Sequence, residues 1–235
     1  MTPLRRIAER LRSRFALGRE DPTRNRACLE FETDGWSVSQ FVLSRLIPAV
    51  GVHPFPLNEL MLMVATMCRF RPPQLFEWGT HVGKSARVFH EVASHYRIDC
   101  DIHSVDLPAD ASHIEHPGGE RGRLVRGLRG VHLHLGDGLD TSLRLWHERG
   151  RKAGVLFFVD GDHARDSVKR EFSTIVREVP DACVLLHDSF YQSAGSGYNV
   201  GPYEAIGEVL ASAPGRYRRL DSGLGLPGMT LVYPA

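Results

Sequence analysis

The sequence lacks the features that mark secreted, membrane-spanning and zinc-binding proteins. Its longest apolar runs, such as 155–159 and 60–65, fall far short of the about 20 residues that a transmembrane helix needs. No apolar signal core follows the basic N-terminus. The four cysteines form no CxxC pair, which disfavours both a disulfide framework and a zinc site. We therefore expect a cytoplasmic protein with reduced thiols and no membrane partner.

The sequence also lacks an excess of charge of one sign. Lys and Arg number 29 and Asp and Glu 28, so no global field favours a nucleic-acid partner. Locally, residues 3–17 predict a basic amphipathic helix. We favour docking of this helix on the domain or on a second subunit over an arm that binds a membrane surface or nucleic acid. A homodimer is therefore an open alternative.

A chain of 235 residues with 42% hydrophobic residues is long enough to bury one α/β core. Helical patterns at 37–46 and 56–70 predict an N-terminal helical extension or cap over residues 1–71. Residues 72–235 then alternate short strands and helices, which predicts a parallel sheet covered on both faces. The predicted strands are 74–78, 100–105, 131–135, 155–159, 182–186, 217–220 and 229–233, and the last two follow each other closely enough to predict an antiparallel edge pair.

The turn after the first predicted strand, 77–85, reads Glu-Trp-Gly-Thr-His-Val-Gly-Lys-Ser. Gly79 permits a tight turn, and Gly83 lets the next helix start close to the strand. A P-loop needs four residues between its glycines and this turn has three, although Lys84-Ser85 keeps ATP binding as an alternative. His81 stands where a dinucleotide fingerprint has its second glycine. An adenosine cofactor without phosphates does not need that glycine.

Acidic residues follow the next two strands at the same predicted edge of the sheet. Asp106 can accept both hydroxyls of a ribose, and Asp137 can accept from an adenine amino group. Each also has an ordinary interpretation as a helix cap or turn residue. Acids after three successive strands, at the end where parallel sheets bind ligands, favour the cofactor interpretation.

The fourth and fifth strands end in Asp160-Gly-Asp162-His163 and in His187-Asp188. Adjacent strand ends lie about 5 Å apart, so Asp160, His187 and Asp188 are predicted metal ligands. Oxygen donors with one imidazole suit Mg²⁺ or Mn²⁺ better than a metal that prefers thiolates. The alternative is that the two aspartates only orient cofactor and substrate through hydrogen bonds, and both interpretations stay open.

Taken together, these motifs resemble class I SAM-dependent methyltransferases. They are the Glu77 to Ser85 turn, the Asp160 to His163 ending with Val168-Lys169 downstream, and the His187-Asp188 ending. The nearest branch includes cephalosporin-hydroxylase-like proteins and macrocin-type sugar O-methyltransferases. The resemblance covers roughly residues 72–235.

The resemblance implies a doubly wound, mostly parallel seven-stranded sheet of the Rossmann-like methyltransferase type, with an antiparallel last strand. It implies Mg²⁺ ligation by Asp160 and Asp188 and a general base at Asp162. His187 departs from it, because several metal-dependent members carry an acid at that position. With the turn and strand-end analysis, the predicted residues that bind S-adenosylmethionine (SAM) are Glu77, Gly79, Thr80, Gly83, Ser85, Asp106, Asp137 and Asp160.

The predicted function is methyl transfer from SAM to a hydroxyl of a small molecule, such as a sugar or a natural-product intermediate. We expect Mg²⁺ to assist and Asp162 or His163 to take the proton. Segments 108–128 and 189–203 flank the predicted site and suit a lid over a polar ring compound. The alternatives are a SAM-binding relative with other chemistry or a non-catalytic partner role, and an ATP-binding protein.

Overall fold

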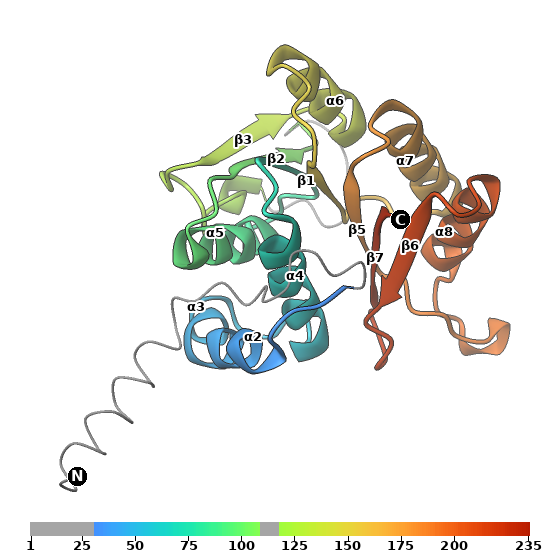
Figure 1. Ribbon diagram of the computed structural model, residues 1–235, viewed down its shortest axis with the longest axis horizontal. Coiled ribbons are helices and arrows are strands. Elements are labelled where there is room, and N and C mark those ends of the chain that lie inside the picture. Colours follow the sequence, from blue (N-terminus) through green and yellow to red (C-terminus); the bar gives the residue numbers. More distant parts are fainter. Residues whose placement is uncertain (1–30, 109–117) are drawn as a thin grey trace, which may run out of the picture.

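Seven strands form one mixed sheet in the part of the chain that the structure, a computed structural model, describes: residues 31–108 and 118–235 (Figure 1). The strands are β1 (Gln74–Trp78), β2 (Asp101–Asp106), β3 (Val131–Leu135), β4 (Leu156–Val159), β5 (Cys183–His187), β6 (Tyr217–Asp221) and β7 (Met229–Pro234). Their order is β3-β2-β1-β4-β5-β7-β6, and β7 runs antiparallel to both of its neighbours. This confirms the predicted doubly wound, mostly parallel sheet with an antiparallel last strand.

Helices cover both faces of the sheet. One face carries α2 (Gly35–Phe41), α3 (Ile47–Val50), α4 (Leu57–Phe70) and α5 (Lys84–Tyr96), and the other carries α6 (Gly138–Glu148), α7 (Arg165–Glu178) and α8 (Gly201–Ser212) (Figure 1). Short 3₁₀ turns lie at Gly118–Glu120 and Ala194–Ser196. None of the helices in the described ranges has the length and apolarity to cross a membrane. The predicted helix at 3–17 and residues 109–117 of the predicted lid lie outside those ranges.

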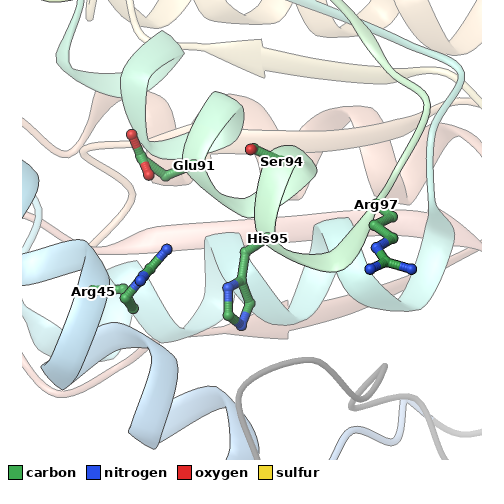
Figure 2. Close-up of a pocket in the computed structure, with 5 residues that line it drawn as sticks. All are labelled: Arg45, Glu91, Ser94, His95 and Arg97. Atoms are coloured by element: carbon green, nitrogen blue, oxygen red, sulfur yellow. The ribbon is translucent and has the colours of Figure 1, made fainter. Parts of the chain in front are cut away.

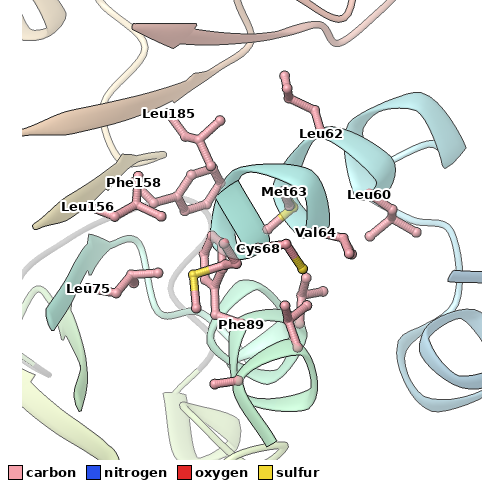
Figure 3. Close-up of a cluster of buried hydrophobic side chains, with 14 of the residues drawn as sticks. Leu60, Leu62, Met63, Val64, Cys68, Leu75, Phe89, Leu156, Phe158 and Leu185 are labelled. Atoms are coloured by element: carbon pink, nitrogen blue, oxygen red, sulfur yellow. The ribbon is translucent and has the colours of Figure 1, made fainter. Parts of the chain in front are cut away.

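Helix α4 packs directly on the sheet. Leu60, Met63 and Met67 are fully buried on it, and Figure 3 shows α4 side chains directed toward Phe158 and Leu185 of the central strands. Each large apolar side chain buried in this way stabilises the fold by about 1.5–3 kcal/mol. Residues from the predicted N-terminal extension therefore share one hydrophobic cluster with β1, β4 and β5.

The predicted helix at 37–46 is interrupted. After α2 the chain forms a π-helical turn over Val42–Leu46 and continues as α3 up to Gly51. Ile47 N–H donates to the carbonyl of Val42, five residues back. Pro48 has no N–H to donate to the usual partner four residues before it, and this favours the wider turn. Pro56, predicted just inside the start of the next helix, instead occupies the cap position before Leu57.

Candidate functional site

The carboxyl ends of the parallel strands meet at one edge of the sheet and bring the predicted acids together. The register pairs Glu77 with Ser104 of β2 and with Phe158 of β4. Val159 in turn pairs with Leu186, so Asp160 and His187 follow on neighbouring strands. Ligands of open α/β sheets bind beyond this edge.

The turn after β1 lies against the end of β4. Gly79 has a φ of +95°, and a Cβ atom on it would lie 2.2 Å from the carbonyl oxygen of Asp160. Its N–H donates to the carbonyl of Val105 at 3.0 Å. No residue with a side chain fits here without moving the end of β4. Gly83, with a φ of +87°, sits at the cap position of α5, as the sequence predicts.

Glu77 is buried at the centre of this edge, with 1% of its surface exposed. Its Oε1 accepts from Ser104 Oγ at 2.6 Å, and Thr80 Oγ1 lies 2.6 Å from the same hydroxyl. Burial raises the pKa of Glu77 to about 7, although hydrogen bonds from Ser104 and Ser85 act in the opposite direction. Five of the predicted cofactor residues, Glu77, Gly79, Thr80, Gly83 and Ser85, thus lie in or beside one turn.

Asp106 organises the backbone around that turn. Its carboxylate accepts from the N–H of His81 at 3.0 Å and of Leu107 at 2.8 Å, and it lies 3.3 Å from Arg121 Nε. His81 adopts a φ of +45°, a left-handed conformation that glycine adopts without strain. The hydrogen bond from the N–H of His81 to Asp106 helps to hold the histidine backbone in this conformation.

Asp137 caps α6 by accepting from the N–H of Asp140 at 2.9 Å. Its side chain is 45% exposed, so it stays accessible to a ligand at the end of β3. Its predicted contact with adenine remains a prediction.

Lys84 does not extend into open space beside the turn. Its ammonium donates to the backbone carbonyl of His53, in the segment that leads into α4. A P-loop lysine instead reaches toward the phosphates of its ligand. The structure therefore gives Lys84 a tethering role that does not depend on ATP.

Asp160, His187 and Asp188 form a cluster in which one ligand atom from each lies within 4.8 Å of the others. His187 Nδ1 is 2.8 Å from Asp160 Oδ1 and 3.8 Å from Asp188 Oδ2. Bonds of about 2.1 Å to Mg²⁺ place opposite ligands about 4.2 Å apart, so these separations fit one shared cation. Two carboxylates and one imidazole also form a donor set that Mg²⁺ or Mn²⁺ accepts.

The charge on His187 depends on the carboxylates around it. Burial by itself would lower its pKa, but the carboxylates of Asp160, Glu59 and Asp188 outweigh that effect and raise the pKa to about 10. In the metal-free protein the imidazolium therefore supplies positive charge between the carboxylates. A divalent cation would have to displace the proton on Nδ1.

The two predicted proton acceptors have different surroundings. Both carboxylate oxygens of Asp162 accept hydrogen bonds at the start of α7, from the N–H of Ala164 at 2.9 Å and from the hydroxyl of Ser167. His163 Nδ1 lies 3.2 Å from Asp188 Oδ2, and the imidazole is 35% exposed. A hydrogen on Nδ1, on the side of Asp188, would leave Nε2 of His163 as the acceptor nitrogen of this partly exposed ring.

The sequence analysis missed Glu59. This side chain is fully buried on α4, and its Oε2 lies 3.0 Å from His187 Nε2. Its other oxygen accepts from the N–H of Gly228 at 2.7 Å. A signal was present: Glu59 is the one carboxylate in the apolar segment 57–70, at a position where its neighbours one turn later are buried.

A cavity of about 180 Å³ lies elsewhere, lined by Arg45, Glu91, Ser94, His95 and Arg97 (Figure 2). It lies at the carboxyl end of α5, opposite the edge where that helix begins after β1. None of the predicted site residues lines it.

Known proteins match this fold and this edge of the sheet. Residues 76–190 match a family model described as a methyltransferase domain. An O-methyltransferase from Bacillus cereus, solved in complex with SAH, has a TM-score of 0.54 and 15% identity over 89% of this chain and 94% of that chain. The O-methyltransferase TomG from Streptomyces achromogenes, involved in tomaymycin synthesis and solved with SAM, has a TM-score of 0.55 and 17% identity over 89% of this chain and 93% of that chain.

A third solved structure is CalS11, a TDP-rhamnose 3'-O-methyltransferase of calicheamicin biosynthesis. It has a TM-score of 0.54 and 14% identity over 99% of this chain and 95% of that chain. No curated protein sequence matches the chain. The matched segment runs from within β1 to just beyond β5, so it contains the turn, the acids and the cluster described above. Residues 76–190 therefore belong to a methyltransferase domain, and the sheet that contains them has the fold of the solved O-methyltransferases.

Proposed function

We propose that the protein transfers the methyl group of SAM to a hydroxyl of a small molecule, a sugar or a natural-product intermediate, with help from a divalent cation. The observation that carries this proposal is the cluster of Asp160, His187 and Asp188 beside the Glu77 turn. A cation site that adjoins a cofactor site suits an acceptor oxygen that must lose its proton. TomG, an O-methyltransferase involved in tomaymycin synthesis, and CalS11, a TDP-rhamnose 3'-O-methyltransferase, support the acceptor class.

Residues at the ends of β1, β2 and β3 suit the cofactor. Acceptor-only carboxylates at Glu77, Asp106 and Asp137 suit the ammonium, ribose and adenine donors of SAM. The sulfonium is already a strong electrophile, so the protein must chiefly align donor and acceptor and exclude competing nucleophiles. Gly79 keeps the turn against Asp160, so cofactor and cluster share one rigid edge.

The cation, when bound by Asp160, His187 and Asp188, supplies positive charge that lowers the pKa of a hydroxyl beside it. His163 then takes the proton through Nε2, because Asp188 holds the proton on Nδ1. Asp162 is the alternative base that the family resemblance implies. Both carboxylate oxygens of Asp162 already accept hydrogen bonds, and this favours His163 as the base.

Binding and turnover test the proposal in sequence. We expect SAM and SAH to raise the thermal midpoint of unfolding, and ATP and NAD to leave it unchanged. At a ligand concentration of a hundred times the dissociation constant, binding stabilises the folded state by about 2.7 kcal/mol. Incubation with SAM, Mg²⁺ and a panel of nucleoside-diphosphate sugars and phenolic compounds should then yield a methylated product by mass spectrometry. Stabilisation by ATP alone would overturn the proposal.

Two outcomes correspond to the other hypotheses. SAM binding without any methylated product across the acceptor panel would favour a relative with other chemistry or a non-catalytic partner role. Equal turnover with Mg²⁺ and with EDTA would remove the cation from the proposal and leave Asp160 and Asp188 as hydrogen-bonding residues. We also propose a homodimer, which sedimentation velocity tests directly.

A further inference from the structure

A carboxylate buried away from water needs hydrogen bonds or positive charge to offset its lost hydration, and Glu59 has a polar partner at each of its two oxygens. The side chain lies among the apolar residues of α4 and is fully buried. Taking a carboxylate out of water costs several kcal/mol unless hydrogen bonds and opposite charge offset that cost. The N–H of Gly228 donates to Oε1 at 2.7 Å, and His187 Nε2 lies 3.0 Å from Oε2.

These contacts place Glu59 behind the imidazole and outside the cation cluster. His187 faces Glu59 with Nε2 and faces Asp160 with Nδ1 at 2.8 Å. Within residues 31–108 and 118–235, the ligand atoms that converge come from Asp160, His187 and Asp188. Phe55 packs its edge against the imidazole, with ring centroids 5.0 Å apart, and limits rotation of the ring.

A carboxylate in this position selects one form of the imidazole. Glu59 can only accept from His187, so the hydrogen must sit on Nε2. When the imidazole is neutral, Nδ1 is then the nitrogen with a lone pair, and it faces Asp160 and Asp188. Histidines that bind metals commonly donate their other N–H to a carboxylate in this way, and loss of that partner weakens metal binding by about 10- to 100-fold.

We infer that Glu59 is a positioning residue that holds His187 with Nδ1 free to bind a divalent cation at the carboxyl edge of the sheet. The inference rests on the proposed function and extends it to a helix outside the matched segment 76–190. His187 is then a neutral ligand whose orientation depends on a carboxylate, Glu59, that lies outside the cluster.

Glu59→Gln tests the inference without emptying the buried space. The amide oxygen of glutamine can still accept from Gly228, but its NH₂ group faces His187 and donates to Nε2. The hydrogen then moves to Nδ1, where it donates to Asp160 and blocks the cation. Thr66→Val is the matched control, because Thr66 is equally buried on the same helix and makes no hydrogen bond through its hydroxyl among the described residues.

The measurements are Mn²⁺ affinity by electron paramagnetic resonance, SAM affinity by calorimetry, and the ¹⁵N signals of His187 in the metal-free protein at alkaline pH. We expect Glu59→Gln to weaken Mn²⁺ binding by about 10- to 100-fold and to move the imidazole hydrogen to Nδ1. SAM affinity should stay within about twofold of wild type, and Thr66→Val should match wild type throughout. Unchanged Mn²⁺ affinity in Glu59→Gln overturns the inference and leaves the proposed function intact.

A second variant separates positioning from support of the loop at Gly228. In a His187→Asp background the imidazole is absent, and Glu59 faces another carboxylate. Adding Glu59→Gln there should change Mn²⁺ affinity far less than it does in wild type, because no imidazole remains for residue 59 to orient. A loss of stability and affinity in both backgrounds would instead assign Glu59 only to holding Gly228. Absence of Mn²⁺ binding by the wild-type protein would overturn the cation part of the proposed function, and this inference with it.

Discussion

His103 makes the stability of the protein depend on pH in a way that can be calculated. The side chain on β2 is fully buried and stacks on Phe76, with ring centroids 5.1 Å apart. Its Nδ1 lies 3.1 Å from Nε2 of His134. Burial lowers the pKa of His103 to about 3, and the charges of Arg149, His132 and His134 act in the same direction against a smaller opposite effect of Asp101.

The sign follows from comparing folded and unfolded chains. In the unfolded chain a histidine is protonated below a pKa of about 6.5, whereas in the folded protein His103 stays neutral until the pH approaches its pKa of about 3. Its contribution to stability is therefore complete above pH 6.5 and is lost as the pH falls toward 3. Each pH unit between these values costs about 1.4 kcal/mol, so the step from pH 6.5 to pH 4.5 costs about 2–3 kcal/mol.

Urea unfolding of wild type and of His103→Phe, at pH 7.5 and at pH 4.5, measures the loss of unfolding free energy that His103 causes. Phenylalanine keeps the stacked contact with Phe76 and does not titrate. We expect wild type to lose about 2–3 kcal/mol more than the variant between the two pH values, since carboxylates that titrate in both proteins cancel in the difference. Equal losses would refute the reasoning, as would an NMR signal showing that His103 is protonated in the folded protein at pH 4.5.

Two further predictions concern the edge of the sheet. Gly79→Ala should destabilise the fold by about 2–6 kcal/mol in urea unfolding, because it adds backbone strain to a clash with Asp160. Gly150→Ala is the control, since Gly150 also has a positive φ, +86°, but no atom lies within 4 Å of the new Cβ, and it should cost only about 1–2 kcal/mol. Equal costs for the two variants would contradict the clash. His163→Gln should lower kcat by about 10²- to 10⁴-fold without changing SAM affinity, and Asp162→Asn should mainly cost about 1 kcal/mol of stability. The reverse pattern in kcat would assign the base to Asp162.

Hydrophobic patterning predicted the centre of the sheet well because β1, β4 and β5 are buried on both faces. Strand β1 has the predicted bounds, Gln74 and Trp78, and all five of its residues are buried. Acids directly after such parallel strands must lie at one edge, which is why the sequence alone predicts that Asp160, His187 and Asp188 lie close together. A parallel sheet converts order along the chain into proximity in space.

The features that sequence could not supply depend on contacts between distant segments. Asp188 and His81 adopt left-handed conformations, with φ values of +52° and +45°. A glycine in the sequence would indicate such a conformation, whereas an aspartate or a histidine does not. Glu59 lies 128 residues before its partner His187, on a helix whose pattern predicts only core packing. A buried ionic contact of this kind becomes visible only when both elements have been placed on the sheet.

The position of β7 has a consequence for how the enzyme is made. This strand lies between β5 and β6, and the backbone of Gly228 just before it holds Glu59, 169 residues earlier. A nascent chain that has emerged only as far as β5 already contains every motif that resembles a methyltransferase. It still lacks the neighbour of β5 and the donor that fixes Glu59 behind His187. We therefore expect cofactor and metal binding to appear on the ribosome only after residues 228–234 have emerged, as a late and abrupt event rather than a gradual one.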